Sequence, residues 1–169
     1  ETDMMATLLM VRPAAFNYNA QTAVNNAFQN ANSEESNAVN QAAQREFDDF
    51  VDALRAKHVD VLVVQGSAEP HTSDSIFPNN WISFHEDGTI VVYPMFAQNR
   101  RLERDKEVLH LVKQHFVISK RINLTDYETH DQFLEGTGSF VLDRVNRIAY
   151  ACLSPRTDRE VFDHFCREL

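Results

Sequence analysis

Apolar residues recur at helical spacing in three places along the chain. Within each set the members stand mainly three or four residues apart, which brings them onto one face of a helix. The third set also has a start signal, because Thr157 and Glu160 have the spacing of a capping box. We therefore predict three amphipathic helices, with apolar stripes at Phe47, Phe50, Val51 and Leu54; at Val108, Leu109, Val112 and Phe116; and at Val161, Phe162, Phe165 and Leu169.

Two β-hairpins are predicted between and after these helices. The dipeptide Asp87-Gly88 separates two apolar runs, at 81–84 and 89–93, and this arrangement is the strongest short-range hairpin signal. A second hairpin is expected over 139–153. Each hairpin precedes one of the predicted helices.

Strand-like runs at 59–64 and 117–122 follow the first and second helices. Their centres, Val61 and Ser119, lie 58 residues apart, so the order hairpin, helix, strand returns with that period. The sequence therefore predicts an α/β fold of ββαβ repeats, with the closing strand of the third repeat expected beyond this sequence. The alternative is an α+β domain in which the spacing is accidental.

The 169 residues include 16 Lys and Arg against 25 Asp and Glu, a formal charge of −9. Proteins that bind polyanions without specificity cluster Lys and Arg, and no apolar run approaches the ~18 residues of a membrane span. We expect no nucleic-acid or membrane partner. Two cysteines and the lack of a signal peptide favour a cytoplasmic location.

Cys152 and Cys166 adjoin apolar stretches, and we interpret both as small core residues rather than nucleophiles. The histidines form no metal-binding motif, so neither a metal nor another cofactor is expected. Residues 17–44, rich in Asn, Gln, Ala and Ser, predict a long surface loop. About residues 1–7 are expected to be foreign to the natural protein or disordered.

Four polar blocks stand at the start of predicted strands or helices, where α/β folds place their sites. Asp74 and Glu135 precede equivalent hairpins, so they would converge on one cavity and hold a planar cation such as guanidinium. Arg156, with Arg100 or Arg101, would bind a carboxylate in fork geometry. The competing interpretation is structural: a helix cap, a turn acid and surface ion pairs. The blocks are 73–81, 99–104, 133–138 and 153–158.

These blocks resemble motifs of the guanidino-group-modifying superfamily, also called amidinotransferase-type or pentein enzymes. The nearest branch is that of bacterial citrulline-utilisation hydrolases, related to arginine deiminases and dimethylarginine dimethylaminohydrolases. The resemblance runs from about Val11 through nearly the whole chain. Its motifs are Val11-Arg12-Pro13, Asn25-Asn26-x-Phe28-Gln29, Phe77-Pro78-Asn79-Asn80-Trp81, Tyr93-Pro94-Met95, Asn99-Arg100-Arg101-x-Glu103-Arg104, Phe133-Leu134-Glu135-Gly136-Thr137-Gly138 and the run from Ala149 to Asp158.

The resemblance implies a five-bladed α/β propeller, the pentein fold, of which this chain would hold about three ββαβ units. Residues 1–169 would then be the N-terminal part of a single catalytic domain. In that superfamily a cysteine thiolate attacks the guanidino or ureido carbon, a histidine moves protons, and carboxylates grip the substrate nitrogens. Glu135 matches the catalytic acid, Asp74 a substrate-binding acid, and Arg156 the arginine that binds the substrate carboxylate, with Arg100 or Arg101 as a second.

Phe77 and Asn80 belong to the same implied substrate block. Where dimethylarginine enzymes carry a second Asp, this chain has Asn80, whose amide carries no charge, so the chain departs from the dimethylarginine pattern there. No motif here matches the nucleophilic cysteine or the catalytic histidine. The resemblance therefore implies the N-terminal portion of a Cys-dependent hydrolase or amidinotransferase that is inactive alone and acts on arginine, citrulline or a related amino acid.

The alternative function is a non-catalytic module that binds a guanidino ligand. The reading frame beyond Leu169 separates the two, since only an enzyme needs a further block with a cysteine. We also expect the chain to associate with itself or with the C-terminal half of the same enzyme. Phe162 and Phe165 are the predicted contact residues.

Overall fold

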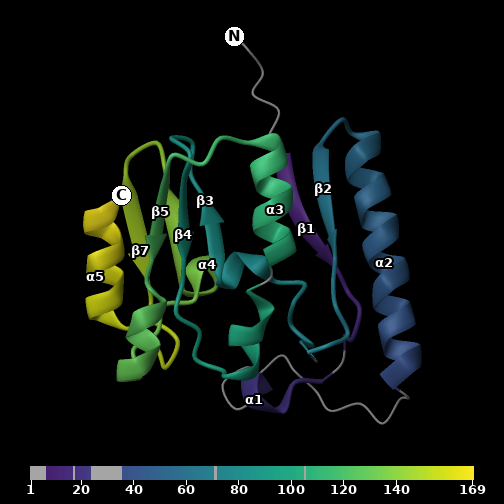
Figure 1. Cartoon of the computed structure of the whole chain (residues 1–169), viewed down its shortest axis with the longest axis horizontal. Helices are drawn as coiled ribbons and strands as arrows, with labels where there is room; N and C mark the ends of the chain where they lie inside the picture. The colour runs from purple at the N-terminus through teal and green to yellow at the C-terminus, as the bar shows by residue number, and fades with distance from the viewer. Residues whose placement is uncertain (1–6, 17, 24–35, 71, 105) are drawn as a thin grey trace. The chain divides into compact units, whose positions relative to one another are not determined.

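The structure is a computed structural model that describes residues 7–16, 18–23, 36–70, 72–104 and 106–169 (Figure 1). The chain divides into two compact units, and each is described by itself. The first unit comprises residues 1–77 and 105–111, and the second comprises 78–104 and 112–169. The prediction for residues 1–7 lies outside the described residues except for Thr7, which begins a strand.

Two parallel strands and a long helix form the first unit. Strand β1 (Thr7–Arg12) pairs in parallel with β2 (Asp60–Gln65). Helix α2 (Ser36–Ala56) connects them, as a parallel pair requires, and lies alongside β2 in Figure 1. The short α1 (Ala20–Ala23) lies between β1 and α2 in the sequence. The predicted strand at 59–64 and the predicted first helix are confirmed.

The predicted loop over 17–44 is wrong from Ser36 onward, where α2 begins. The polar residues that suggested a loop make tertiary contacts from the helix. Asn40 Nδ2 donates to the carbonyl of Ala14 at 3.0 Å, and Gln44 Nε2 donates to that of Pro13 at 2.8 Å. Polar composition therefore marks the helix face that holds the chain after β1. Residues 24–35 of the predicted loop lie outside the described residues.

The second unit contains the two predicted hairpins. Strands β3 (Ile82–Phe84) and β4 (Thr89–Val92) are antiparallel, and β5 (Lys120–Asn123) pairs in parallel with the other edge of β4. Strands β6 (Phe140–Asp143) and β7 (Ile148–Ala151) form the second antiparallel pair. Both hairpin predictions are confirmed, and β5 confirms the strand predicted at 117–122, although it begins three residues later.

The remaining helices follow the predicted order. Helix α3 (Lys106–His115) precedes β5, and α5 (Arg159–Glu168) follows β7. The chain therefore runs hairpin, helix, strand and then hairpin, helix, which agrees with the repeat in the sequence. Four short helices lie in the connections: η1 (Pro78–Asn80), η2 (Asn99–Glu103), η3 (Thr125–His130) and α4 (Gly136–Ser139).

Aromatic rings fill the core of the second unit. Phe140 stacks on Phe165 with ring centroids 4.7 Å apart, and Tyr93 meets both rings edge-on or tilted. The prediction that Phe165 is a contact residue for association is therefore wrong, because its side chain is 1% exposed within this unit, and Phe162 is partly buried against the same cluster. The cluster comprises Val91, Tyr93, Ile122, Leu124, Leu134, Phe140, Val161 and Phe165.

The predicted cap of the last helix needs correction. Helix α5 is capped by Asp158, whose carboxylate accepts the backbone N–H groups of Glu160 and Val161, so the cap lies one residue after the predicted Thr157. The Thr157 hydroxyl instead pairs with that of Ser154 at 3.1 Å.

The two cysteines are exposed rather than buried in the core. Cys152 directly follows β7, and Cys166 follows the buried Phe165 in α5. Among the described residues, no helix is long and apolar enough to cross a membrane.

Candidate functional site

The predicted catalytic acid, Glu135, directly precedes the one-turn helix α4, which packs on η1. Two glycines make this packing possible. A Cβ on Gly136 would lie 2.2 Å from the Asn79 carbonyl oxygen, and one on Gly138 would lie 2.6 Å from Asn80 Nδ2. Gly136 also has a φ of +40°. The Glu-Gly-Thr-Gly block therefore places a carboxylate beside the amide of Asn80.

The Glu135 carboxylate is 1% exposed, and both of its oxygens have protein partners. Oε1 accepts the backbone N–H of Phe96 at 3.1 Å, and Oε2 accepts the Asn80 amide at 3.3 Å. Two guanidinium groups approach Oε2, with Arg156 Nη1 at 3.5 Å and Arg100 Nη1 at 3.8 Å. Positive charge from two sides offsets the cost of burying this carboxylate.

The two arginines differ in how firmly they are held. The Arg100 side chain is 4% exposed and forms a bidentate pair with Glu103, with contacts of 3.0 and 2.9 Å. The Arg156 side chain is 30% exposed and meets Glu135 beyond ordinary hydrogen-bond distance. Arg156 is therefore the guanidinium that can leave Glu135 at lower cost.

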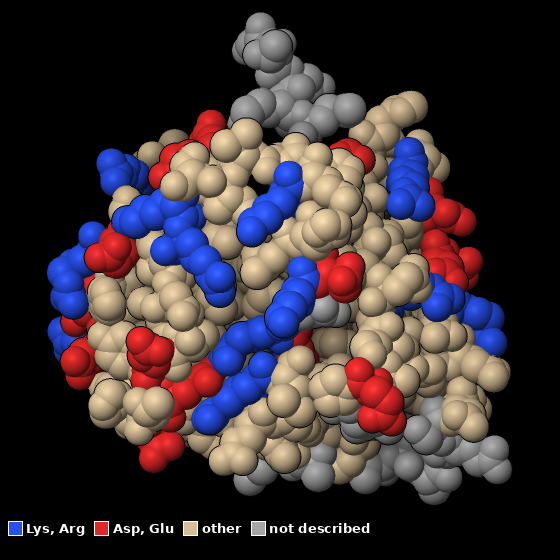
Figure 2. All heavy atoms as spheres, in the orientation of Figure 1, with Lys and Arg blue, Asp and Glu red and all other residues tan. Residues whose placement is uncertain are grey.

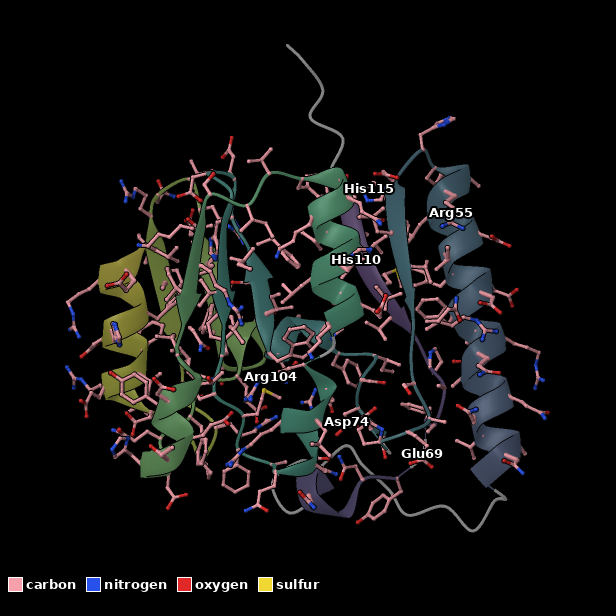
Figure 3. The ribbon with its side chains drawn as sticks, in the orientation of Figure 1. Arg55, Glu69, Asp74, Arg104, His110 and His115 are labelled. Atoms are coloured by element: carbon pink, nitrogen blue, oxygen red, sulfur yellow. The ribbon has the colours of Figure 1, made fainter. Side chains whose placement is uncertain are left out.

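A second group of charges, centred on Glu128, has no counterpart in the sequence-based prediction. Glu128 Oε1 accepts the backbone N–H of Met95 at 2.7 Å and a guanidinium N–H of Arg104, which Figure 3 labels. Arg101 Nε lies 3.6 Å from Glu128 Oε2, donates to the Met95 carbonyl at 3.0 Å, and its guanidinium stands over the Phe133 ring. Glu128 lies in a polar turn with no recognisable motif, so the sequence holds no signal for it.

Asp74 belongs to the first unit and is 4% exposed. Its Oδ2 accepts the Asn19 amide at 2.8 Å and the Thr22 hydroxyl at 3.1 Å. Sequence reasoning missed both partners, which precede Asp74 by more than 50 residues. Phe77, three residues after Asp74, is 45% exposed. Since Glu135 belongs to the second unit, the convergence of Asp74 with Glu135 stays a prediction.

Charge on the molecular surface is mixed in sign. On the face drawn in Figure 2, basic side chains lie among acidic ones and do not gather into a single positive patch. Each unit also contains ion pairs, among them Arg12 with Asp48 and Lys120 with Glu168.

Comparison with known proteins agrees with this arrangement. The sequence profile of eukaryotic N,N dimethylarginine dimethylhydrolase matches residues 12–169. The N-terminal domain of ArgZ with bound substrate, an arginine dihydrolase from the ornithine-ammonia cycle in cyanobacteria, has a similar fold, with a TM-score of 0.69 at 15% identity. A dimethylarginine dimethylaminohydrolase with an S-methyl-L-thiocitrulline adduct gives 0.64 at 14% identity. No curated protein sequence gives a significant match.

Each of these two structural matches covers 96% of the chain, which spans 54% of the ArgZ domain and 56% of the dimethylarginine enzyme. The complex of AgrE with ornithine and NAD+ gives a TM-score of 0.67 at 17% identity, over 94% of this chain and 21% of that one. At these identities the structures establish the mixed α/β fold over about half of the ArgZ domain.

Sequence and fold together define a member of the guanidino-group-modifying, or pentein, superfamily. Within it, the chain belongs to the N,N dimethylarginine dimethylhydrolase family.

Proposed function

We propose that this chain supplies the substrate-binding part of a Cys-dependent hydrolase or amidinotransferase that acts on the guanidino or ureido group of arginine, citrulline or a related amino acid. One observation carries the proposal: the buried Glu135 carboxylate is already approached by the protein's own guanidinium, that of Arg156, at 3.5 Å. A site that accommodates one planar guanidinium has the charge and shape to accept another.

The substrate guanidinium would replace Arg156 at Glu135. Arg156 would then turn its fork of donors to the α-carboxylate of the same ligand, because its side chain is partly exposed and meets Glu135 only at 3.5 Å. Arg101, with 25% of its side chain exposed, is the second candidate for this carboxylate. Arg100 is better suited to keep Glu135 and Glu103 in place, since its Nε and Nη2 already donate to the Glu103 carboxylate.

The family chemistry fits the remaining residues. Thiolate attack on a guanidinium carbon gives a neutral tetrahedral adduct, and protonation of the departing nitrogen puts positive charge on it. A carboxylate held in a water-poor site stabilises positive charge on these nitrogens without reorganisation. Asp74 would grip another substrate nitrogen, with Phe77 and Asn80 at the side of the ligand. The nucleophile and proton shuttle would come from chain that completes the domain, in a propeller of five ββαβ units of which this chain holds about three. Because Asn80 replaces the second acid of the dimethylarginine enzymes, the proposed substrate is arginine, citrulline or a related amino acid rather than dimethylarginine itself.

Calorimetric titration of the purified chain with L-arginine and L-citrulline tests the proposal. We expect saturable binding of at least one of them, and Glu135→Gln should weaken L-arginine binding by about tenfold or more, since a lost charge-assisted pair is worth ~1.5–3 kcal/mol. Glu168→Gln is the control, because it removes a carboxylate that is paired with Lys120 and lies outside the proposed site.

Two results would contradict the proposal. One is no binding of either amino acid by the wild-type chain. The other is equal affinity for L-arginine in the wild type and in Glu135→Gln, which would return Glu135 to a purely structural role.

A further inference from the structure

Ser139, the last residue of α4, bonds to the main chain of two site residues at once. Its Oγ accepts the N–H of Glu135 at 3.0 Å and donates to the carbonyl of Arg156 at 2.7 Å. The Glu135 N–H also lies 3.2 Å from the same Arg156 carbonyl. One hydroxyl therefore bridges the backbone that carries the acid and the backbone that carries the arginine.

A hydroxyl suits this bridge, because it offers a good acceptor and a good donor on the same atom. An alanine offers neither, while a threonine keeps both. The bridge is also local, since Ser139 contacts the main chain of Arg156 and no bond to the Arg156 guanidinium is formed.

Other bonds also hold the segment around Arg156, among them a bridge between Thr157 and Leu134 and the direct bond from the Glu135 N–H to the Arg156 carbonyl. Its N–H donates to Ser154 Oγ at 3.2 Å, and the neighbouring Asp158 N–H donates to the Phe133 carbonyl at 2.7 Å. Ser154 and Pro155 are exposed, so the Arg156 backbone lies at the edge of the unit. The shortest bond that ties it to the Glu135 side of the site is the one from Ser139.

We infer that Ser139 is a positioning residue that fixes the Arg156 guanidinium relative to the Glu135 carboxylate. This inference rests on the proposed function, in which Glu135 holds the guanidino or ureido end of the ligand and Arg156 holds its α-carboxylate. The Ser139 bridge then sets the distance between the two ends, and so the length of amino acid that the site accepts.

The first test compares two ligands that differ only at the end Arg156 would hold. L-arginine carries the α-carboxylate, and agmatine lacks it. Ser139→Ala should weaken L-arginine binding by about tenfold, an ordinary cost for a lost directional contact, and weaken agmatine binding by less than about threefold. Ser139→Thr should restore the wild-type ratio. Equal losses for both ligands in Ser139→Ala would overturn the inference, because general damage to the fold makes no distinction between them.

The second test needs no ligand. Urea unfolding of Ser139→Ala, Arg156→Ala and the double variant gives the coupling between the two side chains. Because Ser139 touches only the main chain of Arg156, a merely structural bond predicts additive losses. Positioning predicts that Arg156→Ala loses at least half of its destabilising effect once Ser139 has been replaced. Additive losses would overturn the inference, whereas failure of the wild type to bind L-arginine would contradict the proposed function instead.

Discussion

The two hairpins of the second unit are alike in sequence and differ in burial. Strands β3 and β4 bury both faces, with only Phe84 partly exposed. Strands β6 and β7 have a similar share of apolar residues, yet Phe140 is the only fully buried member. Val91 in β4 is 0% exposed, while Val141 in β6 is 67% exposed. The apolar pattern therefore specifies a hairpin, and the neighbouring elements decide which of its faces is buried.

The two hairpins also differ in whether a third strand pairs with them. Strand β4 pairs with β3 on one edge and with β5 on the other, whereas β7 pairs only with β6 among the described residues. The apolar residues on the outer face of β6–β7, defined here as Val141, Ile148 and Tyr150, are each more than 40% exposed, and Asp143 shares this face. A strand that is apolar on both faces is typical of a buried position. Strands β6 and β7 therefore expose apolar residues of the kind that β3 and β4 bury.

The largest expected difference between the two hairpins comes from placing a charge on each of them. Val91→Asp should unfold the chain or cost at least about 4 kcal/mol, because the carboxylate would enter the aromatic core without a partner. Val141→Asp should change the free energy of unfolding by less than about 0.5 kcal/mol. Urea unfolding of both variants gives the two values. Similar losses would show that the outer face of β6–β7 is covered in solution.

A smaller effect comes from His85, which connects the two hairpins. Its Nε2 lies 2.9 Å from Ser83 Oγ and its Nδ1 lies 3.1 Å from Arg144 Nη1, in the turn between β6 and β7. Burial, together with the charge of Arg144, lowers the pKa of His85 from 6.5 to about 4. The folded chain therefore binds fewer protons than the unfolded chain between these values, and its stability falls as the pH falls through this window.

The His85 contribution should be complete above pH ~6.5 and lost by pH ~4. Because the ring is half-buried, solvent screening limits the change to about 1–2 kcal/mol. Thermal unfolding of the wild type and His85→Gln from pH 4 to pH 7 measures it, with His115→Gln as a control for a histidine whose side chain is exposed. Parallel pH profiles for the wild type and His85→Gln would show that this connection carries no pH dependence.

The smallest effect is association through the outer face of β6–β7. Exposed apolar faces and open strand edges promote pairing between chains, so we expect concentration-dependent self-association near ~100 μM. Val141→Lys combined with Tyr150→Lys should shift the chain to monomer in sedimentation velocity. Val145→Lys is the matched control, since Val145 is 92% exposed in the turn and lies off this face. A wild-type chain that stays monomeric would contradict this use of the face.

Local patterns in the sequence predicted the fold more reliably than the environment of single residues. The dipeptide Asp87-Gly88 and the apolar periodicity of α5 are local signals, and both gave the correct element. The burial of Cys152 depends on whether another element covers β7, which no local pattern reports. The prediction of the helix cap was wrong for a related reason. Both Thr157 and Asp158 can cap a helix, and the contact of Thr157 with Ser154 leaves Asp158 as the cap.

The residues of the candidate site also differ in how far the sequence predicts them. A short motif and a family resemblance point to Glu135 and Arg156, and the structure brings these two together. Glu128 and Ser139 act through contacts with backbone that is distant in sequence, so their side chains gave no signal. The proposed roles of Asp74 and Phe77 depend on an arrangement that a pattern along one chain does not specify.

The central claim is that Glu135 holds the guanidino group of an amino acid in place of Arg156. A crystal structure of the chain soaked with L-arginine tests it most directly. We predict that the ligand guanidinium lies about 2.7–3.2 Å from the Glu135 carboxylate and that the Arg156 guanidinium turns to the ligand carboxylate. L-arginine bound elsewhere, with Arg156 still against Glu135, would contradict the account.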